Sequence, residues 1–201
     1  GRFDALADEM EHTLLKASYS SIVSEAQDAT AAVFDIKGGT VSQACAIPIH
    51  LGALSELGKR FAETYPKGTA EDGDLYLVND PYAGGTHLPD FGMASPVFFQ
   101  NKLIGYVATM THHQDIGGAA PGSASTDVYD HHSEGIRIPL LKLASAGKLD
   151  TDIIELLVAN SRSPHNMRGD LYAQIAGCRT GEQSMAKIFG DIGVDTTTRG
   201  I

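Results

Sequence analysis

Residues 90 to 112 read DFGMASPVFFQNKLIGYVATMTH, and this stretch predicts a β-hairpin. Two mostly apolar runs, residues 94 to 99 and residues 103 to 110, have the composition of buried strands. The polar residues Gln100-Asn101-Lys102 lie between these runs and are typical of a turn. We therefore expect the two runs to pair as neighbouring antiparallel strands.

The open end of this hairpin carries side chains that bind metals. Asp90 and His112 are equally far from Asn101, and residues equally far from the centre of an antiparallel hairpin face each other. His87 lies three residues before Asp90, in a loop that contains Gly and Pro. The register of the hairpin therefore groups His87, Asp90 and His112.

The other segments predict a mixture of helices and strands. Helical periodicity of apolar residues is found over residues 3 to 23, 51 to 64, 149 to 159 and 168 to 189. Strand patterns are found at residues 31 to 36, 40 to 44, 75 to 78 and 136 to 143. These elements predict an α+β fold, with a mixed or antiparallel sheet and flanking helices, in a single domain over residues 1 to 201.

The composition excludes several classes of protein. The formal net charge of −10 comes without a basic cluster, which argues against nucleic acid or an anionic membrane surface as a partner. Cys45 and Cys178 are far apart, which argues against a disulfide scaffold and a thiolate zinc site. No apolar run approaches the roughly 20 residues of a membrane helix. A cytoplasmic protein fits these features best.

Two imidazoles and one carboxylate are a chemically sensible metal site. His87, Asp90 and His112 could hold a divalent ion and leave coordination positions open for water and substrate. Water bound to such an ion becomes a nucleophile near neutral pH. The alternative is that these side chains only satisfy backbone groups of their loops.

Five further polar residues are candidates for supporting roles. His113 suits a substrate contact, and Asp115 suits a general base, a partner of a ligand histidine or a loop cap. Asp35 and His50 fall at the ends of predicted strands and are candidates for additional metal ligands or for partners that hold a ligand in place. Arg137 could neutralise an anionic substrate or pair with Glu134.

Nucleotide-binding and serine-hydrolase motifs are missing from the sequence. There is no GxxxxGK[ST] loop and no GxGxxG after a strand, so this chain offers no recognisable site for ATP or a dinucleotide. There is also no GxSxG, which argues against a serine-hydrolase elbow.

Several motifs stand in a fixed order along the chain: YSSIVSE at 19 to 25, NDPY at 79 to 82 with GTHLPD at 85 to 90, HH at 112 to 113 with DIGG at 115 to 118, PGS at 121 to 123 and EGIRIP at 134 to 139. In this order they resemble the hydantoinase B/oxoprolinase family. That family includes the B subunit of N-methylhydantoinase, the C-terminal half of 5-oxoprolinase and the alpha subunits of acetone carboxylase-type enzymes. The resemblance runs from about Leu6 to Gly181.

The resemblance implies a subunit of an ATP-dependent enzyme. In such systems a partner A-type subunit binds ATP and activates a carbonyl oxygen, and the B-type subunit completes the reaction at a metal centre. The manganese ligands of the carboxylase relatives match His87, Asp90 and His112 here, so manganese or zinc is the expected metal. Members of the family are much longer, and we expect this chain to be the N-terminal part of a larger subunit in a hetero-oligomer.

Three functions follow from the resemblance. The first is hydrolysis of a cyclic amide such as a hydantoin or 5-oxoproline, with Asp115 or His113 moving protons. The second is ATP-dependent carboxylation of a ketone, such as acetone or acetophenone, at the same site. The third is a non-catalytic fragment that serves only in assembly.

Overall fold

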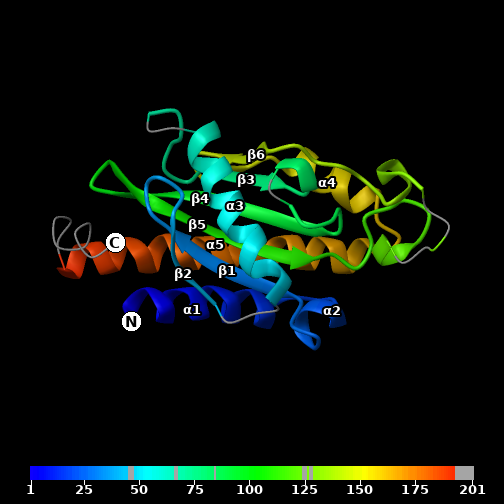
Figure 1. The fold of residues 1–201 in the computed structure, drawn as a ribbon, viewed down its shortest axis with the longest axis horizontal. Coiled ribbons are helices and arrows are strands. Elements are labelled where there is room, and N and C mark those ends of the chain that lie inside the picture. Colours follow the sequence, from blue (N-terminus) through cyan, green and yellow to red (C-terminus); the bar gives the residue numbers. More distant parts are fainter. Residues whose placement is uncertain (45–47, 66–67, 84, 124–125, 127–128, 193–201) are drawn as a thin grey trace.

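The computed structural model describes residues 1–44, 48–65, 68–83, 85–123, 126 and 129–192 (Figure 1). Its centre is a seven-stranded sheet in the order β2-β1-β5-β4-β3-β6-β7, and every pairing is antiparallel. The strands are β1 (Ala29–Phe34), β2 (Thr40–Gln43), β3 (Leu75–Val78), β4 (Asp90–Phe99), β5 (Lys102–His112), β6 (Leu141–Ser145) and β7 (Lys148–Leu149).

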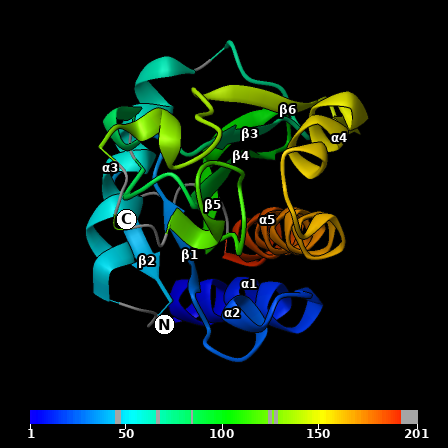
Figure 2. The ribbon, with the colours of Figure 1, turned by 90° about the vertical axis from the view of Figure 1, so that its right-hand side faces the viewer.

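Helices cover both faces of this sheet (Figure 2). One face carries α3, and the opposite face carries α1, α4 and the long α5, which packs along α1. The helices are α1 (Arg2–Ala17), α2 (Ser21–Ser24), α3 (Pro48–Thr64), α4 (Thr151–Ala159) and α5 (Pro164–Ile192). Short 3-10 turns lie at Pro81–Ala83, Pro121–Ser123 and His131–Ser133. The predicted α+β class is confirmed, and the sheet is antiparallel. No helix in the described ranges is both long and apolar enough to cross a bilayer.

The β4–β5 hairpin has the predicted partners, but its turn differs from the prediction. Asp90 pairs with His112, as expected. The turn consists of only Gln100 and Asn101, which both have positive φ angles of 50° and 61°, and Lys102 already belongs to β5. A bulge then places one extra residue, Ile104, in β5, because Phe98 pairs with Leu103 whereas Val97 pairs with Gly105. The short turn and the bulge together give the same register as a symmetric three-residue turn.

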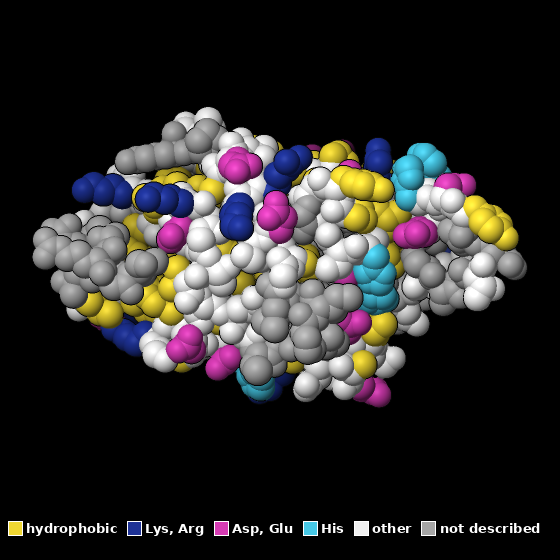
Figure 3. Space-filling view, in the orientation of Figure 1, with side chains coloured by type: hydrophobic (Ala, Val, Ile, Leu, Met, Phe, Trp, Pro, Cys, Tyr) yellow, Lys and Arg dark blue, Asp and Glu magenta, His cyan; other side chains and the backbone are white. Residues whose placement is uncertain are grey.

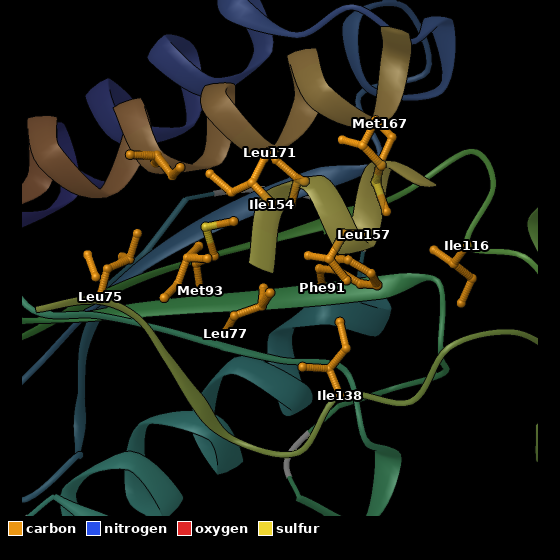
Figure 4. Close-up of a cluster of buried hydrophobic side chains, with 14 of the residues drawn as sticks. Leu75, Leu77, Phe91, Met93, Ile116, Ile138, Ile154, Leu157, Met167 and Leu171 are labelled. Atoms are coloured by element: carbon orange, nitrogen blue, oxygen red, sulfur yellow. The ribbon is translucent and has the colours of Figure 1, made fainter. Parts of the chain in front are cut away.

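The largest hydrophobic cluster fixes α4 and α5 on the sheet (Figure 4). Each of its larger side chains contributes about 1.5 to 3 kcal/mol by leaving water. The close packing holds α5 in one position over β4 and β5, so polar side chains on this helix reach defined points of the strands. The members labelled in Figure 4 are Leu75, Leu77, Phe91, Met93, Ile116, Ile138, Ile154, Leu157, Met167 and Leu171.

Two sequence predictions for the elements are wrong. The helix expected over residues 3 to 23 ends at Ala17 and resumes as α2, because Oδ1 of Asp170 accepts hydrogen bonds from the backbone N–H groups of Tyr19 and Ser20 at 2.7 and 3.1 Å. The strand expected over residues 136 to 143 begins only at Leu141. Backbone groups before that residue bond instead to the side chain of Asn79.

Candidate metal centre

His87, Asp90 and His112 bring their side chains together at the open end of the hairpin. Oδ1 of Asp90 lies 2.8 Å from Nε2 of His87 and 3.1 Å from Nδ1 of His112. The two imidazole nitrogens are 3.2 Å apart. Among the described residues, this is the group of His, Cys, Asp and Glu side chains whose ligand atoms are close enough to share one ion.

The strands determine which of these side chains face each other. Asp90 begins β4, His112 ends β5, and the two residues form one rung of the ladder. Directly paired residues project to the same face of a sheet, which here is the face covered by α3. Asp90 and His112 are buried, whereas the side chain of His87 is 45% exposed and opens the cluster to solvent. Figure 3 shows histidine side chains at the surface of this end of the molecule.

The spacing of the three ligand atoms fits a single divalent ion. Ligands about 2.1 Å from a common ion, at octahedral to tetrahedral angles, are separated by about 3.0 to 3.4 Å. The observed separations of 2.8, 3.1 and 3.2 Å lie at or near this range. Imidazole and carboxylate ligands suit zinc and manganese. In the protein alone, the hydrogen bond with Asp90 raises the pKa of His87, although burial opposes this shift.

Two residues that the sequence analysis missed also touch this cluster. Oδ2 of Asp28 lies 3.9 Å from Nδ1 of His112, and its backbone oxygen accepts a 3.0 Å hydrogen bond from the His112 N–H. The hydroxyl of Thr86 donates to Oδ2 of Asp90. Asp28 directly precedes β1, and Ala29 of β1 pairs with Thr111 of β5. The pairing of β1 with β5 would therefore have predicted that Asp28 lies beside His112.

The loop that carries His87 is held by a buried asparagine. Nδ2 of Asn79 donates to the backbone oxygens of Leu88 and Ile136 at 2.7 and 2.8 Å. Oδ1 of Asn79 accepts from the N–H of Ile138 at 2.6 Å. Asn79 therefore fixes the loop before β4 against the segment that precedes β6.

His113 lies on the opposite face of the sheet from the cluster. Successive strand residues alternate between faces, so His113 projects toward α5 while His112 projects toward α3. The ring of His113 is buried, packs on Phe91 with centroids 4.4 Å apart and lies 2.9 Å from Oε1 of Gln174. Burial lowers the pKa of His113. His113 is therefore not brought together with the cluster, and a contact with substrate or a role in proton transfer stays a prediction.

Asp115 is the centre of an ion pair and not a free base. Its two oxygens accept hydrogen bonds from Nε and Nη2 of Arg162, each at 3.0 Å, and from the Arg162 and Gly117 N–H groups. Burial alone would raise the pKa of Asp115, but the hydrogen bonds from Arg162 and Gly117 hold it below its ordinary value. Of the three roles considered, the structure supports the loop cap.

The remaining candidates lie apart from the cluster or are not described at the level of side chains. Asp35 follows the far end of β1, where Oδ1 accepts from the N–H groups of Lys37 and Gly39, so it is not a ligand here. His50 lies in the first turn of α3, and its side chain is outside the described residues. Nε of Arg137 lies 3.7 Å from Oδ2 of Asp80, and a contact between Arg137 and substrate stays a prediction.

Comparison with known proteins identifies the family of this chain. The family model described as hydantoinase B/oxoprolinase matches residues 1–201. The chain is 36% identical to the caprolactamase subunit beta of Pseudomonas jessenii, over 97% of this chain and 33% of that protein. It is 34% identical to a 5-oxoprolinase of Dictyostelium discoideum, over 96% of this chain and 15% of that protein.

The solved structures show the same fold. The crystal structure of the ATP-dependent caprolactamase from Pseudomonas jessenii superposes with a TM-score of 0.91 at 35% identity, over 99% of this chain and 34% of that chain. The chain thus spans about a third of the length of the caprolactamase subunit. Because the family model covers every residue, this chain belongs to the hydantoinase B/oxoprolinase family.

Proposed function

We propose that this chain is part of the metal-dependent subunit of an ATP-dependent cyclic amidohydrolase. The observation that carries the proposal is the cluster of His87, Asp90 and His112, whose ligand atoms have the spacing of a metal site and open to solvent at His87. The relatives support the class of substrate, because caprolactamase and 5-oxoprolinase are named after cyclic amides. A hydantoin or 5-oxoproline is the type of substrate we propose here.

The three ligands and the residues beside them have different tasks in this proposal. His87, Asp90 and His112 would hold manganese or zinc, with Asp28 as an additional carboxylate beside His112. A bound ion of this kind supplies Lewis-acid chemistry, which polarises a carbonyl group or acidifies water. Thr86 holds the second oxygen of Asp90, so that the first oxygen faces both imidazoles.

ATP would be used by another chain in this proposal. The sequence has neither a phosphate-binding loop of the GxxxxGK[ST] type nor a dinucleotide motif. The relative from Pseudomonas jessenii is named as a beta subunit, and its solved structure is called ATP-dependent. We therefore propose an A-type ATP-binding subunit as the partner, in a hetero-oligomer.

A matched pair of histidine variants tests the proposal. His87→Ala removes an accessible ligand, whereas His165→Ala removes an exposed histidine outside the cluster. We expect the protein, purified with its partner subunit, to contain stoichiometric manganese or zinc and to open a cyclic amide when ATP is present. His87→Ala should lose both properties, and His165→Ala should keep them. Metal analysis and an assay of ring opening provide the two measurements.

The same samples separate the alternatives. Fixation of labelled bicarbonate without ring opening would replace the hydrolase proposal by the ketone carboxylase. Stable assembly with the partner, but no metal and no turnover in the unaltered protein, would leave only the assembly function.

A further inference from the structure

Gln174 lies directly beneath the rung that carries two of the proposed metal ligands. It belongs to α5, and its side chain is fully buried against the sheet. Nε2 of Gln174 donates a 2.8 Å hydrogen bond to the backbone oxygen of Phe91. Oε1 of the same amide lies 2.9 Å from Nε2 of His113.

The chemistry of these two partners fixes the orientation of the amide. The oxygen of Phe91 can only accept a hydrogen bond, so the NH2 group of Gln174 must face it. The amide oxygen then faces His113, whose Nε2 carries the proton and donates. The NH2 group and the oxygen of the Gln174 amide therefore each form a hydrogen bond. One bond reaches Phe91 in β4, and the other reaches His113 at the end of β5.

These contacts fall on the residues that directly follow the two ligands. Phe91 follows Asp90 in β4, and His113 directly follows His112, the last residue of β5. The His113 N–H also donates to the backbone oxygen of Pro89 at 2.9 Å, and the rings of Phe91 and His113 are in contact. Gln174 thus joins the two strands from the face opposite to the metal ligands.

We propose that Gln174 is a positioning residue for the metal centre. By holding Phe91 and His113 from α5, it limits the twist and separation of the strand ends that carry Asp90 and His112. This inference rests on the proposed function, since it assigns Gln174 to the spacing of the ligands of that site. Pre-organised ligands bind a metal more tightly than ligands that must be ordered on binding.

Cys178 provides a matched control on the same helix. It is buried one turn further along α5 and also contacts both strands, through the oxygen of Met93 and the hydroxyl of Thr109. Met93 and Thr109 are paired with each other, on a rung further from the ligands. A substitution at Cys178 therefore disturbs the same helix–sheet contact without touching the ends of the strands that carry the ligands.

The experiment compares Gln174→Met with Cys178→Ala in the complete protein with its co-purifying subunits. Methionine keeps the length of the side chain but removes both hydrogen bonds. The affinity for Zn²⁺ and for Mn²⁺ is measured by competition with a chelator, well below the unfolding temperature of each variant. We expect Gln174→Met to bind about tenfold more weakly, the lower end of the range for outer partners of metal ligands. Cys178→Ala should bind like the unaltered protein.

A second variant keeps the test usable if Gln174→Met does not fold. Burial favours the protonated carboxyl of Gln174→Glu, which keeps an acceptor for His113 and an O–H donor for the Phe91 oxygen, so metal binding should weaken by a smaller factor. Unchanged affinity in a folded Gln174 variant, or an equal loss in Cys178→Ala, would overturn the positioning role. Unaltered protein that binds no metal would overturn the proposed function itself.

Discussion

The neighbouring histidines His112 and His113 lie on opposite faces of the sheet and have different surroundings. On the α3 face, His112 meets the carboxylate of Asp90 and a second imidazole, and the cluster opens to solvent through His87. On the α5 face, His113 meets a neutral amide and an aromatic ring and is closed off from water. The difference shows that the surroundings of a histidine, and not its place in a motif, decide whether it is available for chemistry.

The buried aspartates give the same lesson. Asp90 faces two imidazoles, whose ring nitrogens can bind a metal. Asp115 faces the guanidinium of Arg162, which stays protonated and does not bind metals. The first carboxylate is therefore suited to a reactive site, and the second to holding a loop.

The largest expected effect on metal binding separates the two adjacent histidines. His112→Ala should weaken metal binding at least a hundredfold, because it removes a proposed ligand. His113→Ala should keep metal affinity within about tenfold but lower the free energy of unfolding by about 2 to 3 kcal/mol, since it opens a cavity and leaves Oε1 of Gln174 without its donor. Metal analysis and urea unfolding in the presence of a chelator measure the two effects. Equal metal loss in both variants would break the contrast between the faces.

A chemical test asks whether the α5 face is closed. Burial raises the pKa of the Cys178 thiol to about 12. In a Cys45→Ser background, we expect Cys178 to react with a thiol reagent at about pH 8 roughly a thousandfold more slowly than a free cysteine. Labelling is followed by absorbance, and denaturant should restore the full rate. Rapid labelling of the native protein would mean that this face opens to water.

The Asp115–Arg162 pair should matter for stability and not for metal binding. Asp115→Asn should lower the free energy of unfolding by about 2 kcal/mol, less than for a fully buried pair because the Arg162 side chain is 46% exposed. Urea unfolding measures the change, and the exposed Asp152→Asn serves as the control. Loss of the metal in Asp115→Asn would contradict this assignment and would mean that Asp115 supports the metal site.

The smallest expected effect is the pH dependence of the contribution that the Asp115–Arg162 pair makes to the free energy of unfolding. The pKa of Asp115 is lowered in the folded protein, so its stabilising contribution is complete above the ordinary value of about 4. The contribution is lost as the pH falls through that value toward the folded pKa. The difference in unfolding free energy between unaltered protein and Asp115→Asn should therefore shrink by about 1 kcal/mol between about pH 6 and pH 3. A difference that grows on acidification would contradict the assignment.

The sequence by itself determined the outline of the site. Two mostly apolar runs with a polar turn between them predict a hairpin, and counting outward from Asn101 pairs Asp90 with His112, which is the pairing observed. The HxxD spacing then adds His87. These features are local, so they can be read from a short window of residues.

Only the tertiary structure decided how the site is completed. The bulge at Ile104 sets the register, and without it Asp90 would face Thr111 instead of His112. The partners Asp28, Arg162 and Gln174 come from a neighbouring strand end, the loop after α4 and the helix α5, far from the hairpin in the chain. No local pattern specifies such contacts, because they depend on how whole elements pack. That packing separates His112 and Asp90 from His113 and Asp115.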